Sequence, residues 1–376
     1  MIAIQKSQHF ILSFAEEFSS IASLEQLYEE AQILIYRMFI LNQHSKKWKK
    51  NDLFSHNFSS PLWSKELSIS SQDFSTELYL KLRSIFTTDL GEYPYIALGY
   101  LHENLLADQL IQEDDRISLR SQKESKRKGS GAYYTPIALV RIIVDHIFES
   151  LEAKLEEQPE EERKDYLLSL RFCDPSCGSG NFLRIIQEKL FRLLSQYSNE
   201  KPSLLLAQIN KHCLFGMDLN WLSVELCRFT LAAKTTPFSL CPNIISTDSL
   251  LASWEDIFPS VLTEGGFQYI IGNPPYISSS LLKKHHPDLR LHYQKRFSSC
   301  KGNWDLYIPF SELGLRLLRP EGVVCLLTPK NILGSDYART LQEMWLNNQL
   351  LSILDFSEGN WFPEASISVV AVSCAK

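Results

Sequence analysis

The sequence predicts an α/β protein with a doubly wound, mostly parallel seven-stranded sheet, preceded by an N-terminal helical domain. Three observations lead to this prediction. Short apolar and β-branched runs alternate with helical patterns over roughly the last two thirds of the chain. Polar or glycine-containing turns follow several of these runs. The first third instead places apolar residues at three- and four-residue spacing, which is typical of helices.

The composition is that of an ordinary globular protein, with 376 residues, 44% hydrophobic residues and 22% charged residues. No window approaches about 18 consecutive apolar residues, so we expect no membrane span. The start, Met1 to Phe14, lacks the features of a secretory signal. Eight cysteines without a C-x-x-C pair or zinc-like spacing predict reduced thiols in a cytoplasmic protein and no metal site. The net charge of −6 argues against binding DNA by bulk electrostatics, but it leaves room for a local basic patch.

We expect two domains, 1–128 and 129–376. In the first, Leu24–Asn42 and Tyr95–Ile111 carry helical apolar patterns. The segment Ser118–Ser130 is polar and basic without apolar periodicity, which predicts a linker or loop before the second domain.

The second domain alternates predicted strands and helices. The strands are expected at Ser169–Cys173, Cys213–Met217, Asn243–Ser246, Gln268–Ile271, Val323–Leu327, Leu350–Asp355 and Ser366–Cys374. The helices are expected at Pro136–Leu151, Phe182–Gln196, Leu222–Lys234, Leu306–Leu318 and Tyr337–Asn348. Such alternation predicts crossover units and a Rossmann-like sheet covered on both faces. Only a short loop separates the last two strands, so the final strand can run antiparallel to the others.

The first chemically informative segment is DPSCGSGNF at Asp174–Phe182, between a predicted strand and helix. Its glycines let the backbone turn sharply and approach a ligand. The spacing is not G-x-G-x-x-G and no Lys follows, so neither a dinucleotide site nor a P-loop fits. A carboxylate at the strand end suits an ammonium or sulfonium group; a turn without a ligand is the alternative.

Two further acids follow strand ends. Asp218, in GMDLN, can accept hydrogen bonds from two ribose hydroxyls. Asp248, after the next strand, can accept a bond from an adenine amino group. A helix N-cap is the alternative for each of them.

The strongest signal is Asn273-Pro274-Pro275-Tyr276, at the end of another predicted strand. Pro274 and Pro275 each fix φ and lack an N–H, so the turn is rigid and presents carbonyl groups. An exocyclic amino nitrogen is a poor nucleophile because its lone pair is delocalised into the ring. The Asn273 side-chain oxygen and the Pro274 carbonyl can accept its two hydrogens and make the lone pair available. Tyr276 can stack on a base turned out of the duplex.

Residues 129–376 resemble the γ-type N6-adenine DNA methyltransferases of restriction-modification or phage-defence systems. The resemblance rests on GAYYTP at Gly131–Pro136, DPSCGSGNFL, GMDLN, IIGNPPY, DLYIPFSELGLRLLRPEG at Asp305–Gly322 and LLTPKNIL at Leu326–Leu333. It implies S-adenosylmethionine as the cofactor and the N6 amino group of adenine in DNA as the methyl acceptor. The helical pattern of the first domain is similar, less specifically, to the segment preceding the methylase part of fused type II restriction-methylation enzymes.

The resemblance also implies roles for individual residues. Those implied to hold the cofactor are Tyr134 and Thr135 near its methionine part, Asp174, Gly178 and Gly180 at its amino-acid portion, Asp218 on ribose and Asp248 at adenine. Phe362 matches an aromatic residue that packs on the flipped base, with Trp361 as the alternative.

A basic segment, Ser278–Asn303, directly follows the Asn273 turn. Its basic residues Lys283, Lys284, Arg290, Lys295, Arg296 and Lys301 stand against the single acid Asp288. Because of this position, we expect the segment to contact DNA phosphates, which would hold a strand without specifying sequence. A solvated loop is the alternative.

The chain ends at Lys376, about where the predicted sheet ends, and in the family a target-recognition domain normally follows. The resemblance therefore implies that a separate subunit or a missing C-terminal domain selects the DNA site. A truncated, non-catalytic cofactor-binding subunit is another possibility. The Asn-Pro-Pro-Tyr turn is also compatible with methylation of RNA bases, of cytosine N4 or of a glutamine side chain in release factors.

Overall fold

The computed structural model describes residues 2–44, 50–54, 62, 65–68, 70–85, 99, 101–102, 105, 108–113, 116–121, 135–233, 235, 241–359, 361–362 and 367–376. The chain divides into two compact units, Met1–Arg127 and Lys128–Lys376. None of the described helices is long and apolar enough to cross a membrane. All eight cysteines are buried and unpaired.

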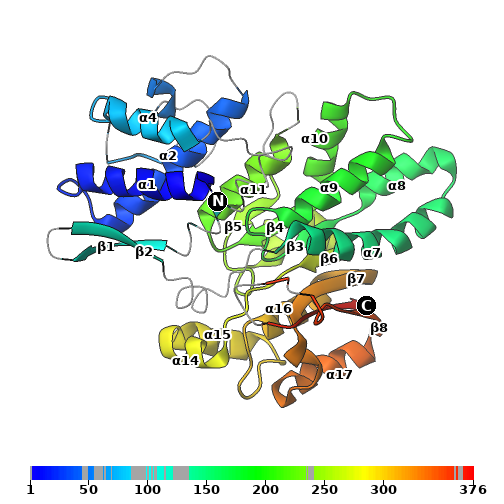
Figure 1. Ribbon diagram of the computed structural model, residues 1–376. Coiled ribbons are helices and arrows are strands. Elements are labelled where there is room, and N and C mark those ends of the chain that lie inside the picture. The colour runs from blue at the N-terminus through cyan, green and yellow to red at the C-terminus, as the bar shows by residue number, and fades with distance from the viewer. Residues whose placement is uncertain are drawn as a thin grey trace. The chain divides into compact units, whose positions relative to one another are not determined.

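The first unit is helical, but it also contains a β-hairpin that the sequence analysis missed (Figure 1). Its elements are α1 (Ile2–Phe18), α2 (Leu24–His44), η1 (Lys50–Leu53), α4 (Thr76–Ile85), β1 (Asp108–Glu113) and β2 (Arg116–Ser121). The α2 helix confirms the pattern at Leu24–Asn42. The predicted helix at Tyr95–Ile111 is wrong from residue 108 onward, because these residues pair with β2. The predicted linker is wrong at residues 118–121, which form part of β2, and its remainder lies outside the described residues.

The second unit contains a seven-stranded sheet with the order β5-β4-β3-β6-β7-β9-β8. Its strands are β3 (Phe172–Asp174), β4 (Leu214–Asp218), β5 (Ile244–Ser246), β6 (Phe267–Gly272), β7 (Leu318–Pro329), β8 (Gln349–Asp355) and β9 (Val369–Ala375). Each overlaps a predicted strand. The final strand is antiparallel to both of its neighbours, as its short connection allowed.

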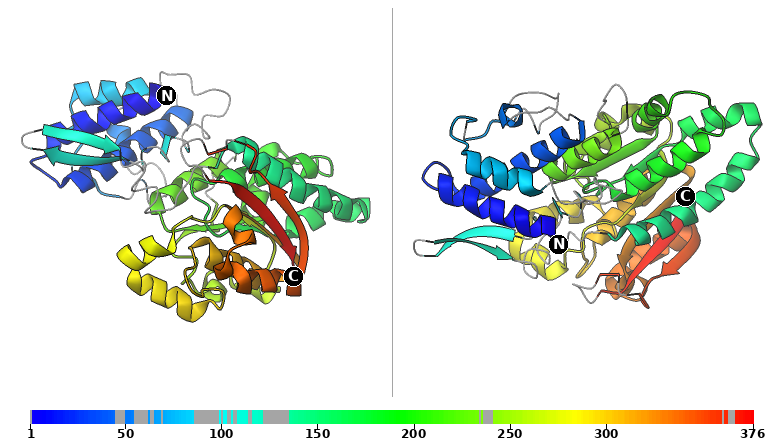
Figure 2. Two further views of the ribbon diagram at one scale, coloured as in Figure 1. Left: turned by 60° about the horizontal axis from the view of Figure 1, so that its bottom comes forward. Right: turned by 45° about the horizontal axis from the view of Figure 1, so that its top comes forward.

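Helices cover both faces of this sheet (Figures 1 and 2). They are α7 (Ile137–Glu156), η2 (Glu160–Glu162), α8 (Arg163–Ser169), α9 (Asn181–Leu194), α10 (Pro202–His212), α11 (Trp221–Ala232), α12 (Trp254–Ile257), α13 (Pro259–Thr263), α14 (Ser279–His285), α15 (Pro287–Arg296), α16 (Tyr307–Leu317), η3 (Lys330–Leu333), η4 (Asp336–Ala338) and α17 (Arg339–Asn347). The five predicted helices are present. The sequence analysis missed α10, although Pro202 at its first turn is a common helix start.

Alternate residues along the strands belong to two different cores. Phe172, Tyr269 and Ile271 pack with α7, α9 and α11 on one face. Cys173 and Ile270 pack with the helices from α12 to α17 on the other. Successive side chains of a strand point to opposite faces of the sheet. Because both faces are buried here, both sets of side chains are apolar, and the runs are continuously apolar.

The chain order places a switch point at the centre of the sheet. From β3 the chain moves outward through β4 and β5, then returns to β6 on the opposite side of β3. All four strands are parallel, so the turns after β3 and β6 lie at the same edge of the sheet. In open α/β sheets ligands bind at such a point, outside the carboxyl ends of the strands.

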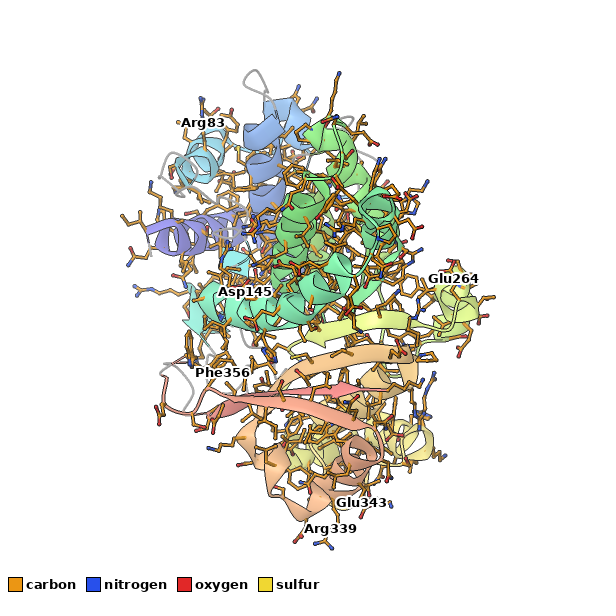
Figure 3. The ribbon with its side chains drawn as sticks, turned by 90° about the vertical axis from the view of Figure 1, so that its right-hand side faces the viewer. Arg83, Asp145, Glu264, Arg339, Glu343 and Phe356 are labelled. Carbon is orange, nitrogen blue, oxygen red and sulfur yellow. The ribbon has the colours of Figure 1, made fainter. Side chains whose placement is uncertain are left out.

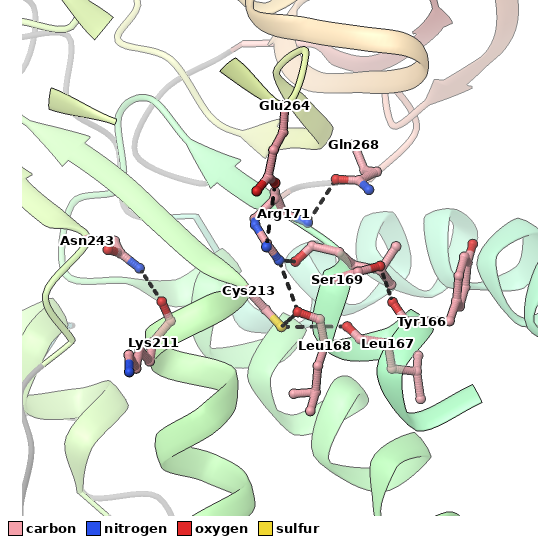
Figure 4. A network of polar contacts seen from close by, with 11 residues as sticks. Tyr166, Leu167, Leu168, Ser169, Arg171, Lys211, Cys213, Asn243, Glu264 and Gln268 are labelled. Atoms are coloured by element: carbon pink, nitrogen blue, oxygen red, sulfur yellow. Dashed lines mark hydrogen bonds and ion pairs between the residues drawn. The ribbon is translucent and has the colours of Figure 1, made fainter. Parts of the chain in front are cut away.

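The opposite, amino end of these strands is closed by polar contacts (Figure 4). Gln268 accepts a hydrogen bond from the Arg171 backbone N–H at 3.1 Å, and the Arg171 guanidinium donates to the Leu168 carbonyl at 3.0 Å. Figure 3 shows the two ends of the sheet. Glu264 lies at one end, just before β6, and Phe356 lies at the other, just after β8. The contacts around Arg171 are therefore structural and far from the switch point.

Candidate active site

The turns after β3 and β6 touch at the switch point. A Cβ atom added to Gly272 would overlap Oδ1 of Asp174, so only glycine fits there. The same Oδ1 accepts the Ser176 backbone N–H at 3.0 Å, and the Ser176 hydroxyl donates to the Asn273 backbone carbonyl at 3.2 Å. The glycine-rich loop and the Asn273 turn, about a hundred residues apart in sequence, are thus joined directly.

Asp218 is joined to the same glycine-rich loop. Its Oδ2 accepts the Gly178 backbone N–H at 2.9 Å, and its Oδ1 accepts that of Asn220 at 2.8 Å. The N-cap of α11 is Asn220, which accepts the N–H groups of Leu222 and Ser223 at 3.0 Å each. The alternative of an N-cap is therefore wrong for Asp218, because Asn220 occupies that position.

Positive backbone φ angles shape the loop between these acids. Gly178 has φ of 51° and Gly180 has φ of 93°, both in the left-handed region that favours glycine. Gly180 also packs against α11, where an added Cβ would lie 2.6 Å from the Cys227 sulfur. The loop therefore needs glycine at these positions for backbone conformation and for close packing.

Asp174 and Asp218 form an electrostatically unfavourable pair. Asp174 is only 1% exposed, and this burial raises the pKa of its carboxyl to about 7. The hydrogen bond from the Ser176 N–H lowers that pKa, while the negative charge of Asp218 raises it further. Burial also raises the pKa of Asp218, against the N–H groups of Asn220 and Gly178. Among the described residues, no Lys or Arg side chain compensates either acid. Such a pair suits a ligand that carries positive charge.

The Asn273 side chain is held at both ends of its amide. Its Nδ2 donates to the Thr135 hydroxyl at 2.9 Å, and its Oδ1 accepts the Tyr276 hydroxyl at 2.5 Å. The Leu327 carbonyl lies 3.1 Å from the same Tyr276 oxygen. Within the described part of the chain, no donor reaches the Pro274 carbonyl oxygen. The turn therefore presents one free carbonyl beside an oriented side-chain amide.

The third acid, Asp248, stabilises its own turn. Its Oδ1 accepts the Leu250 N–H at 2.9 Å within a turn, and the next helix, α12, has Ser253 as its N-cap, so the alternative of a helix N-cap is wrong for Asp248 as well. Its Oδ2 accepts the Tyr293 hydroxyl of α15 at 2.7 Å. The Arg296 guanidinium, also on α15, donates to the carbonyls of Leu251 and Ala252 at 2.9 and 2.6 Å. Residues of α15 thus bond both to the Asp248 side chain and to the backbone of the turn that follows it.

These contacts correct part of the predicted basic surface. Arg290 is wrong as a DNA contact, because it is 6% exposed, lies 4.3 Å over the Trp304 ring and donates to the Gly302 carbonyl at 2.7 Å. The Arg296 guanidinium is already bound to the turn after Asp248. Lys283, Lys284 and Lys295 are exposed, as are Lys301 and His285, His286 and His292. We call these seven residues the α14–α15 basic surface.

The remaining predicted residues are less informative. Phe362 is 8% exposed and packs in the core between the sheet and α7, so the structure buries the ring proposed to stack on a base. Trp361 is half-buried and lies edge-on to Phe356, with ring centroids 6.1 Å apart. Tyr134 lies outside the described residues.

Sequence reasoning missed two participants, Ser176 and Tyr293. Ser176 lies within the recognised glycine-rich loop, but nothing in the sequence indicates that its hydroxyl reaches the Asn273 turn. Tyr293 lies 45 residues after Asp248 in a segment that its charge alone singled out. Both contacts depend on how the sheet brings distant turns together.

Comparisons with known proteins place the chain among proteins similar to restriction-modification methylases. Residues 212–362 match the model of the Eco57I restriction-modification methylase family. The chain is 24% identical over 308 residues to the type II restriction enzyme and methyltransferase RM.Eco57I of Escherichia coli, covering 72% of this chain and 29% of that protein. It is 22% identical over 242 residues to the adenine-specific methyltransferase PglX of Streptomyces coelicolor, covering 52% of this chain and 20% of that protein. The chain thus spans less than a third of either relative.

A solved structure, a putative class I S-adenosylmethionine-dependent methyltransferase from Listeria monocytogenes, superposes with a TM-score of 0.52 at 14% identity, covering 100% of this chain and 88% of that one. This likeness shows the fold. Together with the family model, it implies S-adenosylmethionine as the cofactor. The resemblance drawn from the motifs is confirmed: over residues 212–362 the chain is similar to the Eco57I restriction-modification methylases, and it has the fold of S-adenosylmethionine-dependent methyltransferases.

Proposed function

We propose that this chain transfers a methyl group from S-adenosylmethionine to the N6 amino group of adenine in DNA, within a restriction-modification or defence system. The observation that carries the proposal is the Asn273 turn: an oriented amide oxygen and the Pro274 carbonyl stand beside a buried pair of acids. The family model and the first relative's name support a role in restriction-modification, and the name of the second relative supports adenine as the target.

The residues of the site fit the cofactor. Asp174 and Asp218 lack a compensating cation among the described residues, and the cofactor carries both an ammonium and a sulfonium group. Gly178 and Gly180 allow the backbone to approach its amino-acid portion, while Asp218 can accept its ribose hydroxyls and Asp248 its adenine amino group. When bound, the cofactor supplies an electrophilic methyl group.

The protein's own part in the reaction is to prepare the nucleophile. Asn273 Oδ1 and the Pro274 carbonyl each accept one hydrogen of the target amine, so its nitrogen lone pair turns away from the ring and toward the methyl group. As the N–CH₃ bond forms the S–CH₃ bond would break, and the methylated amine, now positively charged, would lose a proton. Tyr276 packs on the extruded base.

The decisive test is transfer of labelled methyl to genomic DNA, total RNA and release-factor protein in parallel, followed by nucleoside or amino-acid analysis. We expect N6-methyladenine from DNA. N4-methylcytosine, label in RNA or N5-methylglutamine would each contradict the adenine assignment and identify the true substrate class.

We further propose that a separate subunit or domain selects the DNA sequence, so addition of that partner would confine methylation to defined sites.

Replacing exposed lysines of the α14–α15 basic surface should weaken DNA binding without affecting the cofactor. For the Lys283→Ala, Lys284→Ala, Lys295→Ala triple variant we expect lower DNA affinity and a salt dependence reduced by about 0.9 in log K per log salt for each phosphate that is no longer neutralised. Fluorescence anisotropy at several salt concentrations measures both. Lys211→Ala, an exposed lysine on α10, is the matched control. An unchanged salt slope in the triple variant would assign DNA binding to another surface.

Removing the Tyr293 hydroxyl should weaken cofactor binding. Tyr293→Phe deletes the donor to Asp248 and keeps the ring in its packing, so we expect affinity to fall about tenfold or more, because one hydrogen bond to a charged group contributes about 1.5–3 kcal/mol. Isothermal titration measures the change. Tyr337→Phe, which deletes a hydroxyl bonded to Tyr307, serves as the control. Equal affinities for Tyr293→Phe and wild type would leave Asp248 as a turn cap only.

A further inference from the structure

Thr135 contacts the Asn273 side chain although 138 residues separate them. Thr135 is 6% exposed and lies just before α7. Its backbone carbonyl accepts the Asn181 side-chain N–H at 3.4 Å, which joins it to the start of α9. Pro136 follows with φ of −55° and restricts the backbone. The hydroxyl of Thr135 is therefore fixed in place by its neighbours.

The two ends of the Asn273 amide face different hydroxyl groups. Its Oδ1 accepts the Tyr276 hydroxyl, and its Nδ2 donates to the Thr135 hydroxyl at 2.9 Å. The Asn273 oxygen is thus held on the Tyr276 side, with one lone pair still available.

This orientation matters for the proposed reaction. If the amide turned over, its NH₂ group would face the target amine, and two donors would oppose each other. The Ser176 hydroxyl fixes only the Asn273 backbone. The Tyr276 and Thr135 hydroxyls can each donate to an oxygen or accept from a nitrogen, so the two contacts together hold the amide. Only the Thr135 hydroxyl reaches the nitrogen end of the amide among the described residues.

We propose that Thr135 is a positioning residue for methyl transfer: its hydroxyl holds the Asn273 amide so that Oδ1 faces the incoming amine. This inference rests on the proposed function. It also differs from the role that the resemblance implies for Thr135, which is contact with the methionine part of the cofactor. Kinetic measurements distinguish the two roles. Loss of a positioning residue lowers kcat, whereas loss of a cofactor contact weakens cofactor binding.

Thr135→Val and Thr135→Ser form a matched pair. Valine keeps the shape and removes the hydroxyl, while serine keeps the hydroxyl. We expect Thr135→Val to lower kcat about tenfold at saturating cofactor and DNA, with cofactor affinity within about twofold of wild type. Thr135→Ser should restore most of the rate. In an Asn273→Ala background, Thr135→Val should add no further loss, since the two residues act as one unit. A loss of cofactor affinity at unchanged kcat, or additive losses, would overturn the inference.

A measurement independent of turnover separates this inference from the proposed function. In protein labelled with ¹⁵N-asparagine, the side-chain amide protons of Asn273 should exchange with water more slowly in wild type and Thr135→Ser than in Thr135→Val. The Asn273→Ala spectrum assigns the signals. Equal exchange in all three proteins would overturn the role of Thr135 even if DNA is methylated. Slow exchange without methyl transfer to any substrate would instead count against the proposed function.

Discussion

Asn273→Ala should slow methyl transfer severely while the protein still binds its cofactor. The variant loses the oxygen that accepts a hydrogen of the target amine, so we expect kcat to fall at least about a hundredfold, as for loss of one transition-state hydrogen-bonding group. Within the described residues the Asn273 side chain bonds to Thr135 and Tyr276, and neither Asp174 nor Asp218 bonds to it. Cofactor affinity should therefore stay close to that of wild type. Labelled methyl transfer and isothermal titration measure the two quantities separately.

A matched control lies on the same strand. Gln268→Ala removes another side-chain amide from β6, but at the amino end, where Gln268 accepts the Arg171 N–H (Figure 4). This variant should lose some stability and keep its transfer rate. If Asn273→Ala lost cofactor binding as well, Asn273 would belong to the cofactor site. If both variants lost activity alike, the defect would lie in folding.

The sequence predicted the sheet well because its strands are buried on both faces. In a chain with alternating helices, continuous apolar runs such as those at β4 and β6 are most often buried parallel strands. The polar turns after them converge because parallel strands all end at one edge. Asp174, Asp218 and Asn273 could therefore be grouped from the sequence alone.

The sequence could not predict contacts that depend on packing between distant segments. A count of charges in Ser278–Asn303 treats Arg290 and Lys284 alike, yet the guanidinium of Arg290 is buried on Trp304 and the Lys284 side chain is exposed. The β1–β2 hairpin was missed for a related reason: β1 does not alternate polar and apolar residues, and each strand is stabilised by its partner.

Asp174→Asn should remove cofactor binding and yet stabilise the protein without cofactor at alkaline pH. The folded-state pKa of Asp174 is raised to about 7 from an unfolded value of 3.8. Between these two values the folded state holds a proton that the unfolded state has lost, so the stability of wild type falls as pH rises through this window. Above pH 7 the ionised carboxyl lowers the free energy of unfolding by its full amount, which at about 1.4 kcal/mol per pKa unit is ~4 kcal/mol as an upper bound. Asparagine has nearly the same shape and no charge, so the variant does not lose this stability.

Thermal melting at pH 5 and pH 8 tests the stability, and cofactor titration at pH 8 tests the binding. The gain in Tm of Asp174→Asn over wild type should be larger at pH 8 than at pH 5, because wild-type Asp174 is mostly protonated at pH 5. Asp355→Asn provides a control of opposite sign: Lys330 and Ser357 lower the pKa of Asp355 to about 2, so its charge stabilises the fold at both pH values.

Normal cofactor binding by Asp174→Asn would show that the buried charge serves another purpose. A Tm gain independent of pH would show that Asp174 is already neutral or otherwise compensated. Gain of stability with loss of binding would mean that the protein keeps an unfavourable buried charge for its cationic ligand.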